Sequence, residues 1–191
     1  MSLESIVEYF KMRDLTGSEI EKTIGRPPIL YSDLKKYKSL KQLLQGFGYA
    51  IILLQTSSKT TGHFIAITQN NNTGKYRFSD SYGMDPTTIL SYLPYDKNLP
   101  PYIVDLFRGV DSEHNTIDYQ SKKPGVSVCG RWATLFCKFR DLSLPQFHAI
   151  FKTNKSAYLQ QSDNDACLLT LMMLDDITSY LSTITGASRL P

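Results

Sequence analysis

Residues 63–80 read HFIAITQNNNTGKYRFSD, and this stretch decides the fold. It begins with an apolar run rich in β-branched residues, continues with a polar run that ends at Gly74, and finishes with alternating polar and apolar side chains. Such a pattern is typical of two strands joined by a turn. We therefore predict an antiparallel hairpin with strands at His63–Thr68 and Lys75–Asp80.

The hairpin should bring a histidine and an aspartate together. In an antiparallel pair the first residue of one strand lies near the last residue of the next, so His63 and Asp80 are expected at the same end of the sheet. If Gln69 pairs with Lys75, however, Phe64 is the residue that lies opposite Asp80. Contact between the imidazole and the carboxylate then requires a one-residue adjustment, such as a β-bulge.

The residues before the hairpin predict short helices followed by a strand. Apolar spacing favours helices at Leu3–Tyr9 and Thr16–Ile24, and the prolines of Arg26-Pro27-Pro28 end the second one. A third helix is predicted at Ser39–Leu44. The apolar run Tyr49–Gln55 favours a central strand that is covered on both faces.

A buried helix is predicted after Pro124-Gly125. Its apolar residues Trp132, Leu135, Phe136 and Phe139 recur at i, i+3, i+4 and i+7, which is the stripe of an amphipathic helix that faces a core. This helix should run from residue 129 to residue 140.

Five further elements are expected from local patterns. They are a helix at Asp85–Leu93, strands at Tyr102–Phe107 and Thr116–Gln120, and helices at Pro145–Phe151 and Ser162–Leu181.

Together these elements predict an α+β fold, with a central mixed β-sheet flanked by helices. Hydrophobic residues make up 41% of the 191 residues, enough for one good core. We expect one domain over residues 1–191, made of an N-terminal helical segment (1–45) and a catalytic core (46–191).

The composition also limits the partners. A net charge of +3 is too small for a dedicated nucleic-acid binder, although it leaves weak contact with nucleic acid open. No run of 18 apolar residues and no signal-peptide pattern occurs in the sequence. We therefore expect a soluble protein with no membrane contact.

The three cysteines are Cys129, Cys137 and Cys167. They form no CxxC pair and no cluster with histidine at zinc spacing, and their odd number argues against a disulfide framework. The sequence therefore predicts free thiols, and neither a metal nor a cofactor.

Cys129 is the candidate nucleophile, because it stands at the first turn of the predicted buried helix beside the small residue Gly130. A helix N-terminus and a nearby imidazolium, such as that of His63, lower a thiol pKa from about 8.5 to roughly 3.5–7.5. Cys137 and Cys167 lie inside helical segments and are expected to be inert packing residues.

Acyl transfer also needs hydrogen-bond donors for the oxygen that becomes negative. Gln120 can supply one, and the unpaired backbone N–H groups of Cys129 and Gly130 can supply others. Taken singly these signals are weak. His63 could be a strand-end core residue, Asp80 an ordinary turn residue, and Gln120 a solvated surface residue.

Four motifs in a fixed order carry a family resemblance. They are GHFIAI at residues 62–67, FSDSYG at 78–83, YQ at 119–120 and VCG at 128–130. The order His, Asp, Gln, Cys resembles the adenovirus endopeptidase and Ulp-type SUMO protease clan, whereas papain-like enzymes place the cysteine first. The Cys-Gly-Arg-Trp form is most similar to the capsid-maturation proteases of virophages and Polinton-like elements, of the mavirus type.

The resemblance implies a cysteine endopeptidase with Cys129 as nucleophile, His63 as base, Asp80 as orienting acid and Gln120 as oxyanion donor. It also implies an adenain-like or Ulp-like protease fold with a narrow groove that favours cleavage after small residues, notably glycine. The implied protein substrate is a viral capsid precursor, and the implied location is the virion or the viral factory in the host cytoplasm.

Two features depart from the family pattern. Gln120 and Cys129 lie farther apart than in relatives, which predicts an enlarged loop at Lys122–Ser127, and Phe64 replaces the tryptophan that many relatives carry after the histidine. Two other functions also stay open. One is removal of ubiquitin-like modifiers that end in Gly-Gly, and the other is a catalytically silent protein-binding module with an inert Cys129.

Overall fold

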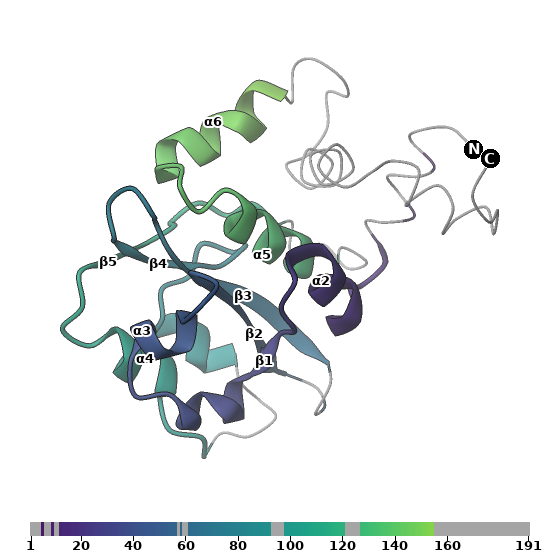
Figure 1. The fold of residues 1–191 in the computed structure, drawn as a ribbon. Coiled ribbons are helices and arrows are strands. Elements are labelled where there is room, and N and C mark those ends of the chain that lie inside the picture. The colour runs from purple at the N-terminus through teal and green to yellow at the C-terminus, as the bar shows by residue number, and fades with distance from the viewer. Residues whose placement is uncertain are drawn as a thin grey trace.

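A five-stranded β-sheet forms the centre of the computed structural model (Figure 1). The structure describes residues 5, 9, 12–56, 58, 61–92, 98–120 and 127–154. The strands follow one another in the sheet as they do in the chain: β1 (Ile29–Leu30), β2 (Tyr49–Gln55), β3 (Gly62–Gln69), β4 (Tyr76–Ser79) and β5 (Ser112–His114). The two inner pairs are antiparallel and the two outer pairs are parallel. The α+β class and the mixed sheet are thus confirmed.

Seven helical elements surround this sheet in the described part of the chain. The α-helices are α2 (Gly17–Ile24), α3 (Leu40–Leu44), α4 (Tyr102–Phe107), α5 (Cys129–Lys138) and α6 (Leu144–Asn154), and the 3₁₀ helices are η1 (Tyr31–Lys36) and η2 (Thr88–Tyr92). None of them is long and apolar enough to cross a membrane.

The predicted helix at residues 16–24 forms because its ends are capped. The Thr16 hydroxyl accepts a hydrogen bond from the backbone N–H of Glu19, and the Glu19 carboxylate accepts one from the backbone N–H of Thr16. Gly25 ends α2 in the left-handed conformation, with φ of 77°. Ser39 caps α3 through the N–H of Gln42. Polar side chains at the helix ends thus set the boundaries that the sequence predicted.

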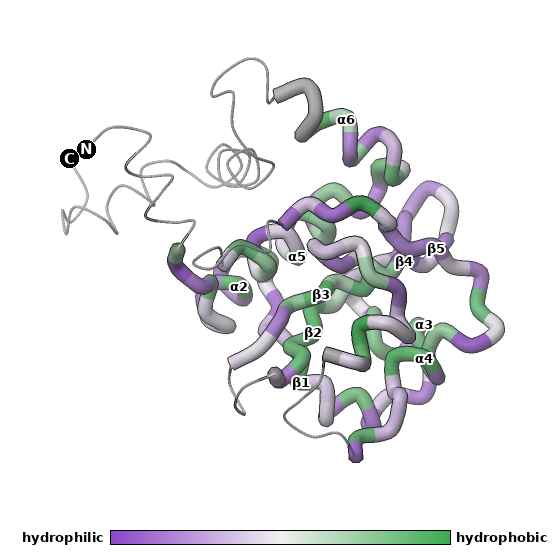
Figure 2. Tube along the Cα trace, turned by 180° about the vertical axis from the view of Figure 1, so that it is seen from behind, coloured by the Kyte–Doolittle hydropathy of each residue, from purple (hydrophilic) through white to green (hydrophobic). Residues whose placement is uncertain are grey.

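The sheet is buried on both faces. On one face α5 packs against β2 and β3, and residues of α2 and α6 belong to the same buried cluster as Ile51 and Ala66. On the other face η1, α3 and α4 cover Ala50, Ile52 and Ile65, among others, and Figure 1 shows α3 and α4 on the side opposite α5. Figure 2 shows hydrophobic colour along β2 and β3 in the middle of the molecule. Burial on both sides explains why β2 is an unbroken apolar run.

The predicted buried helix is α5, which lies over β3. Its residues Trp132 and Leu135 are fully buried and Phe136 is nearly so. The apolar stripe of α5 is therefore buried, as its spacing predicts. Its packing against the sheet positions the start of the helix.

One predicted strand is wrong, because Tyr102–Phe107 forms helix α4. The segment begins after Pro100-Pro101, and Ile103 and Leu106 bury one face at helical spacing. A proline before the first turn suits a helix start, since the groups it removes have no helical partner there. The apolar and β-branched composition of the segment therefore misled the prediction.

A second predicted strand, Thr116–Gln120, is also absent. The last strand is instead β5 at Ser112–His114, which pairs in parallel with β4. These three residues are polar and show no alternation, so no sequence pattern marks them. The helix predicted from Asp85 is present only as the short element η2, and its start is capped by the Asp85 carboxylate through the N–H groups of Thr87 and Thr88.

Several predictions fall wholly or largely outside the described residues. They are the helices at Leu3–Tyr9 and Ser162–Leu181, the loop at Lys122–Ser127, and the thiol of Cys167.

Gly62 is required where β2 and β3 come closest together. It pairs with Gln55, and a Cβ atom in its place would lie 1.9 Å from the carbonyl oxygen of Leu54. No side chain can occupy that position unless the strands separate. The glycine before His63 is therefore a packing requirement of the sheet that carries the histidine.

We predict that Gly62→Ala lowers the free energy of unfolding by about 3 kcal/mol, because its methyl group forces the two strands apart. Gly17→Ala is the matched control, since its Cβ would lie 3.8 Å from Pro28, an ordinary contact, and should change stability by less than about 0.5 kcal/mol. Urea unfolding followed by the fluorescence of Trp132, the only tryptophan, measures both. Equal midpoints for the two variants would contradict this account of Gly62.

Candidate active site

The register of the hairpin places His63 and Asp80 on the same face of the sheet. Gln69 pairs with Tyr76 and Ala66 with Ser79, so the predicted pairing of Gln69 with Lys75 is wrong by one residue. Continued by one step, the observed register sets Asp80 opposite Ile65, which shares a face with His63 because side chains alternate along a strand. The two residues are thus diagonal neighbours, and no bulge is needed.

Asp80 is fully buried and holds the imidazole through a short hydrogen bond. Its Oδ1 lies 2.5 Å from His63 Nε2, and its Oδ2 accepts from the backbone N–H groups of Tyr82 and Met84 at 3.1 Å each. Burial of a carboxylate is costly unless it is hydrogen-bonded. Here both oxygens have partners, which fixes the carboxylate at the end of β4.

Cys129 is the first residue of α5, and its thiol forms a hydrogen bond with His63. Because Nε2 of the imidazole is bound to Asp80, Nδ1 is the nitrogen left for the sulfur. The structure therefore brings together three of the predicted site residues in the order Asp80, His63, Cys129. The first N–H groups of an α-helix have no partners within the helix. Val128, which precedes α5, offers them no side-chain cap.

The charges of these groups stabilise one another. Burial acts to lower the pKa of His63, but the hydrogen bonds and charges of Asp80 and Cys129 outweigh it and raise that pKa from 6.5 to about 9. Burial likewise acts to raise the pKa of Cys129, yet the hydrogen bond and charge of His63, together with the N–H of Phe64, hold it below its ordinary value. At neutral pH an imidazolium thus faces a thiol that loses its proton more readily than an ordinary cysteine does.

A cavity of about 490 Å³ opens beside the thiol. Both Cys129 and His63 line it, with 9% of Cys129 and 13% of the His63 side chain exposed. The other residues at its wall are Leu54, Thr56, Gly62, Tyr82, Met84, Ile89, Ser91, Gln120 and Ser127. The sulfur and the imidazole are therefore reachable by a ligand.

Gln120 reaches the same cavity, although it lies on an irregular segment and not on the predicted strand. Its side chain is only 3% exposed, and its Oε1 accepts a hydrogen bond of 2.9 Å from Ser81 Oγ. All four predicted site residues thus meet at one place.

Three residues around the site were not predicted. The Tyr82 ring stacks on the imidazole of His63, with 5.1 Å between ring centres and 24° between planes. Asn115 bonds the backbone of Asp80 through both ends of its amide, at 2.7 and 2.8 Å. Ser81 holds Gln120. Ser81 and Tyr82 follow Asp80 within a quoted motif, which was a usable signal, whereas no pattern marked Asn115.

The N-terminal segment also contacts the site. The buried guanidinium of Arg131 donates to the carbonyl oxygens of Arg13, at 2.6 Å, and Ser127, at 3.3 Å. The Ser127 hydroxyl donates to the carboxylate of Asp14. Residues 13 and 14 are therefore joined to the loop that leads into Cys129.

Cys137 differs from Cys129 in every respect that matters for reactivity. It lies two turns further along α5, is 1% exposed, and burial raises its pKa far above the ordinary value. The prediction that it packs in the core is confirmed.

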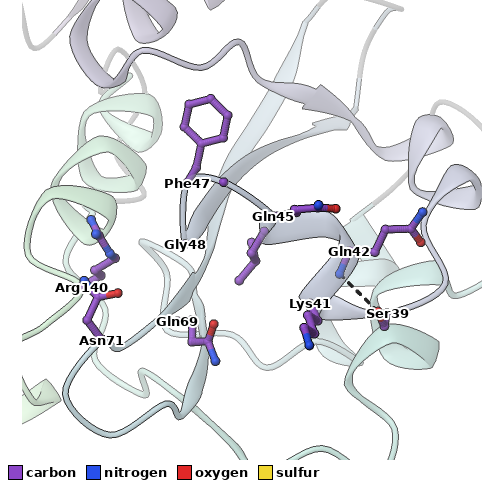
Figure 3. Close-up of a pocket in the computed structure, with 11 residues that line it drawn as sticks. Ser39, Lys41, Gln42, Gln45, Phe47, Gly48, Gln69, Asn71 and Arg140 are labelled. Carbon is purple, nitrogen blue, oxygen red and sulfur yellow. Dashed lines mark hydrogen bonds between the residues drawn. The ribbon is translucent and has the colours of Figure 1, made fainter.

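A second cavity, of about 670 Å³, lies at the other end of β3 (Figure 3). Glutamine and asparagine amides line it together with Lys41 and Arg140, and Figure 3 shows these two cations on opposite sides of Gln69. No cysteine, histidine or carboxylate is among its lining residues within the described part of the chain. Of these two cavities, only the first is lined by both a thiol and an imidazole.

No protein-family model and no curated protein matches the chain.

We predict that iodoacetamide labels Cys129 at pH 7 at least about tenfold faster than Cys137, because only the thiolate reacts. His63→Gln should slow Cys129 labelling about tenfold at pH 7, since the imidazolium that stabilises the anion is lost. Mass spectrometry of the labelled peptides measures both rates. Equally slow labelling of the two cysteines in the wild type would contradict this description of the site.

Proposed function

We propose that the chain is a cysteine endopeptidase in which Cys129 is the nucleophile, His63 the acid and base, and Asp80 the residue that orients the imidazole. The observation that carries the proposal is the hydrogen-bonded series Asp80–His63–Cys129 at the wall of an open cavity. A thiol that only packed in the core would need neither the imidazole nor access to solvent.

In the first half of the reaction the Cys129 thiolate attacks the carbonyl carbon of the scissile peptide bond. A C–S bond forms, the C–N bond breaks, and the His63 imidazolium gives its proton to the leaving amine. A pKa of about 9 keeps this proton on His63 at neutral pH until attack begins. The products are a free amine and a thioester on Cys129.

In the second half a water molecule attacks the carbonyl carbon of the thioester, and His63 accepts a proton from it. A C–O bond forms, the C–S bond breaks, the carboxylic acid product leaves, and Cys129 returns to a thiolate beside the imidazolium. His63 changes from acid to base because the effects that raise its pKa change during the reaction. Two of the effects that raise the pKa come from Cys129, and both weaken once the sulfur is acylated and uncharged. His63 then becomes a better base at the step that needs one.

Negative charge on the substrate oxygen needs fixed donors. Gln120 Nε2 and the backbone N–H of Cys129 are the groups proposed for this role, as both residues line the cavity. Preorganised donors of this kind lower the barrier because they need not reorient during the reaction.

The substrate class is proposed from the resemblance of the His, Asp, Gln and Cys motifs to the adenovirus endopeptidase and SUMO-protease clan. It favours cleavage after glycine-type residues in a capsid precursor of a virophage or Polinton-like element, within a protease fold of the adenain or Ulp type. The five-stranded mixed sheet with Cys129 at the start of a buried helix is compatible with that fold.

The second candidate is removal of ubiquitin-like modifiers, which also end in glycine. Internally quenched peptides that contain Gly-Gly, a capsid precursor and a panel of modifier conjugates separate the two activities by their relative kcat/KM. A protein-binding module without catalysis is the third candidate, and it predicts no turnover of any of these.

We predict that Cys129→Ala reduces cleavage of the quenched Gly-Gly peptides to background, because no other thiol lies within reach of His63 among the described residues. Cys137→Ala removes a thiol from the same helix and should stay close to wild type. Retained turnover in Cys129→Ala would end the proposal.

We predict that Asp80→Asn lowers kcat by about 10²- to 10⁴-fold, because an amide beside Nε2 no longer stabilises the imidazolium. Asp85→Asn is the matched control. Its carboxylate is also bound to two backbone N–H groups, but it caps η2 away from the imidazole, so its kcat should not change. Equal kcat values for the two variants would exclude an orienting role for Asp80.

A further inference from the structure

The ring of Tyr82 stacks on one flat face of the His63 imidazole. The two ring centres lie 5.1 Å apart, and the ring planes differ by 24°. Asp80 and Cys129 form hydrogen bonds with the imidazole, whose nitrogens lie on its edge. The imidazole is thus held at its edge by hydrogen bonds and on a face by an aromatic ring.

The backbone that carries Tyr82 is fixed at the same place. Its N–H donates to Oδ2 of Asp80 at 3.1 Å, while Oδ1 of the same carboxylate is bound to His63. The next residue, Gly83, has φ of 70°, and a Cβ atom there would lie 2.9 Å from the carbonyl carbons of residues 116 and 117. Backbone meets backbone at this turn with no side chain between, so the position of the Tyr82 ring follows from the position of the turn.

A stacked aromatic ring acts differently on the two protonation states of His63. The face of such a ring carries partial negative charge and attracts a cation that lies within about 6 Å of the ring centre. The imidazolium of His63 lies within this range, whereas the neutral imidazole has no net charge and gains less from the same contact. The stack therefore favours the protonated form, in addition to the hydrogen bonds of Asp80 and Cys129.

The titratable groups around the two rings come from three parts of the chain. Asp80, after β4, and Cys129, at the start of α5, face His63. Burial raises the pKa of the Tyr82 phenol, and the charges of Cys129, Asp80 and Asp118, which follows β5, raise it further. The hydroxyl therefore keeps its proton at neutral pH, and Tyr82 acts on the imidazolium through the face of a neutral ring.

We propose that Tyr82 is a positioning residue that stabilises the protonated imidazole of His63 and holds its plane between Asp80 and Cys129. The proposal rests on the proposed function and deepens it. In that function the imidazolium gives its proton to the leaving amine, so the ring of Tyr82 extends the pH range over which His63 can act as an acid. The turn after β4 then has two tasks, since Asp80 binds the edge of the imidazole and Tyr82 supports its face.

The two titration midpoints of the Cys129–His63 pair separate this role from a merely structural one. At the lower midpoint Cys129 loses its proton while His63 stays protonated, and at the upper midpoint His63 loses its proton beside the thiolate. The imidazolium is present before and after the first step and is lost only in the second, so removal of the ring should lower the upper midpoint alone. Loss of the contact between His63 and Cys129 would instead raise the lower midpoint and lower the upper one, because each charge stabilises the other.

We predict that Tyr82→Leu lowers the pKa of His63, which is about 9 in the wild type, by about one unit. The midpoint of Cys129 should not move, because the contact between sulfur and imidazole is kept. NMR titration of protein with isotope-labelled histidine measures the first value, since the chain has three histidines and His63→Gln identifies the signal of His63. The pH dependence of the iodoacetamide labelling rate measures the midpoint of Cys129.

Tyr102→Leu is the matched control. Tyr102 is also a partly buried tyrosine with a ring contact, but its ring lies against Tyr31, 5.7 Å between centres, on helix α4. This control removes a tyrosine and an aromatic contact away from the imidazole, so both midpoints should stay at their wild-type values.

Two further variants keep an aromatic ring in place and so protect the test from a loss of folding. Tyr82→Phe retains the negative face and should titrate like the wild type. Pentafluorophenylalanine at the same position has nearly the same shape, but its fluorine atoms reverse the charge distribution of the ring, so the pKa of His63 should fall again. Equal His63 pKa values in these two variants would overturn the proposal. So would an unchanged pKa in Tyr82→Leu, or a rise in the Cys129 midpoint that matches the fall for His63.

Failure of the proposed function would give a different result. Wild-type Cys129 would then titrate at or above about 8.5 and His63 at or below about 6.5, the ordinary values of the two groups, and the role of Tyr82 would fall with the ion pair. A wild-type His63 pKa near 9 that is the same in every Tyr82 variant would leave the nucleophile and its acid intact and overturn the positioning role alone.

Discussion

The buried hydrogen bond between His63 Nε2 and Asp80 Oδ1 is the interaction on which the rest of the site depends. It exists only in one register of the β3–β4 hairpin, because a slip by one residue turns one of the two side chains to the other face. It also places a carboxylate where water cannot solvate it, so the fold must supply the N–H groups of Tyr82 and Met84 in compensation. The register of the β3–β4 hairpin, the conformation of the turn after β4 and the burial of the Asp80 charge therefore depend on one another.

Two glycines let the backbone elements approach closely enough for this arrangement. Gly62 permits β2 and β3 to approach beside His63, and Gly130 permits α5 to lie against the sheet beside Cys129. A Cβ atom on Gly130 would lie 3.1 Å from Leu15 and 3.2 Å from Phe64, closer than side chains normally pack. The small residues next to the histidine and the cysteine thus set the distance between strand and helix, and through it the distance between imidazole and sulfur.

Periodic patterns predicted the parts of the molecule that bury one regular face. The hairpin, β2 and α5 were foreseen within a residue or two, because their apolar residues follow a period of two or 3.6. Helix α4 at residues 102–107 was not foreseen, because a short run of apolar and β-branched residues suits a strand and a helix equally. Tertiary packing decides which of the two forms. In the site, His63, Asp80, Gln120 and Cys129 could be named from motif order, but their geometry could not. The register depends on the turn, and Asn115 contributes through a contact between segments 35 residues apart, which no local pattern encodes.

The N-terminal segment is part of the scaffold of the site. Arg131 lies two residues after Cys129 and is 2% exposed, and its guanidinium donates to the carbonyl oxygen of Arg13. Leu15 packs against Gly130. The segment therefore stabilises the start of α5. It also carries Asp14, whose negative charge raises the pKa of Cys129 and so opposes the effect of His63. Because the opposing charge is anchored through Ser127, the same contacts that position the sulfur also limit how far its anion is stabilised. The pKa of the Cys129 thiol therefore depends on the N-terminal segment as well as on His63.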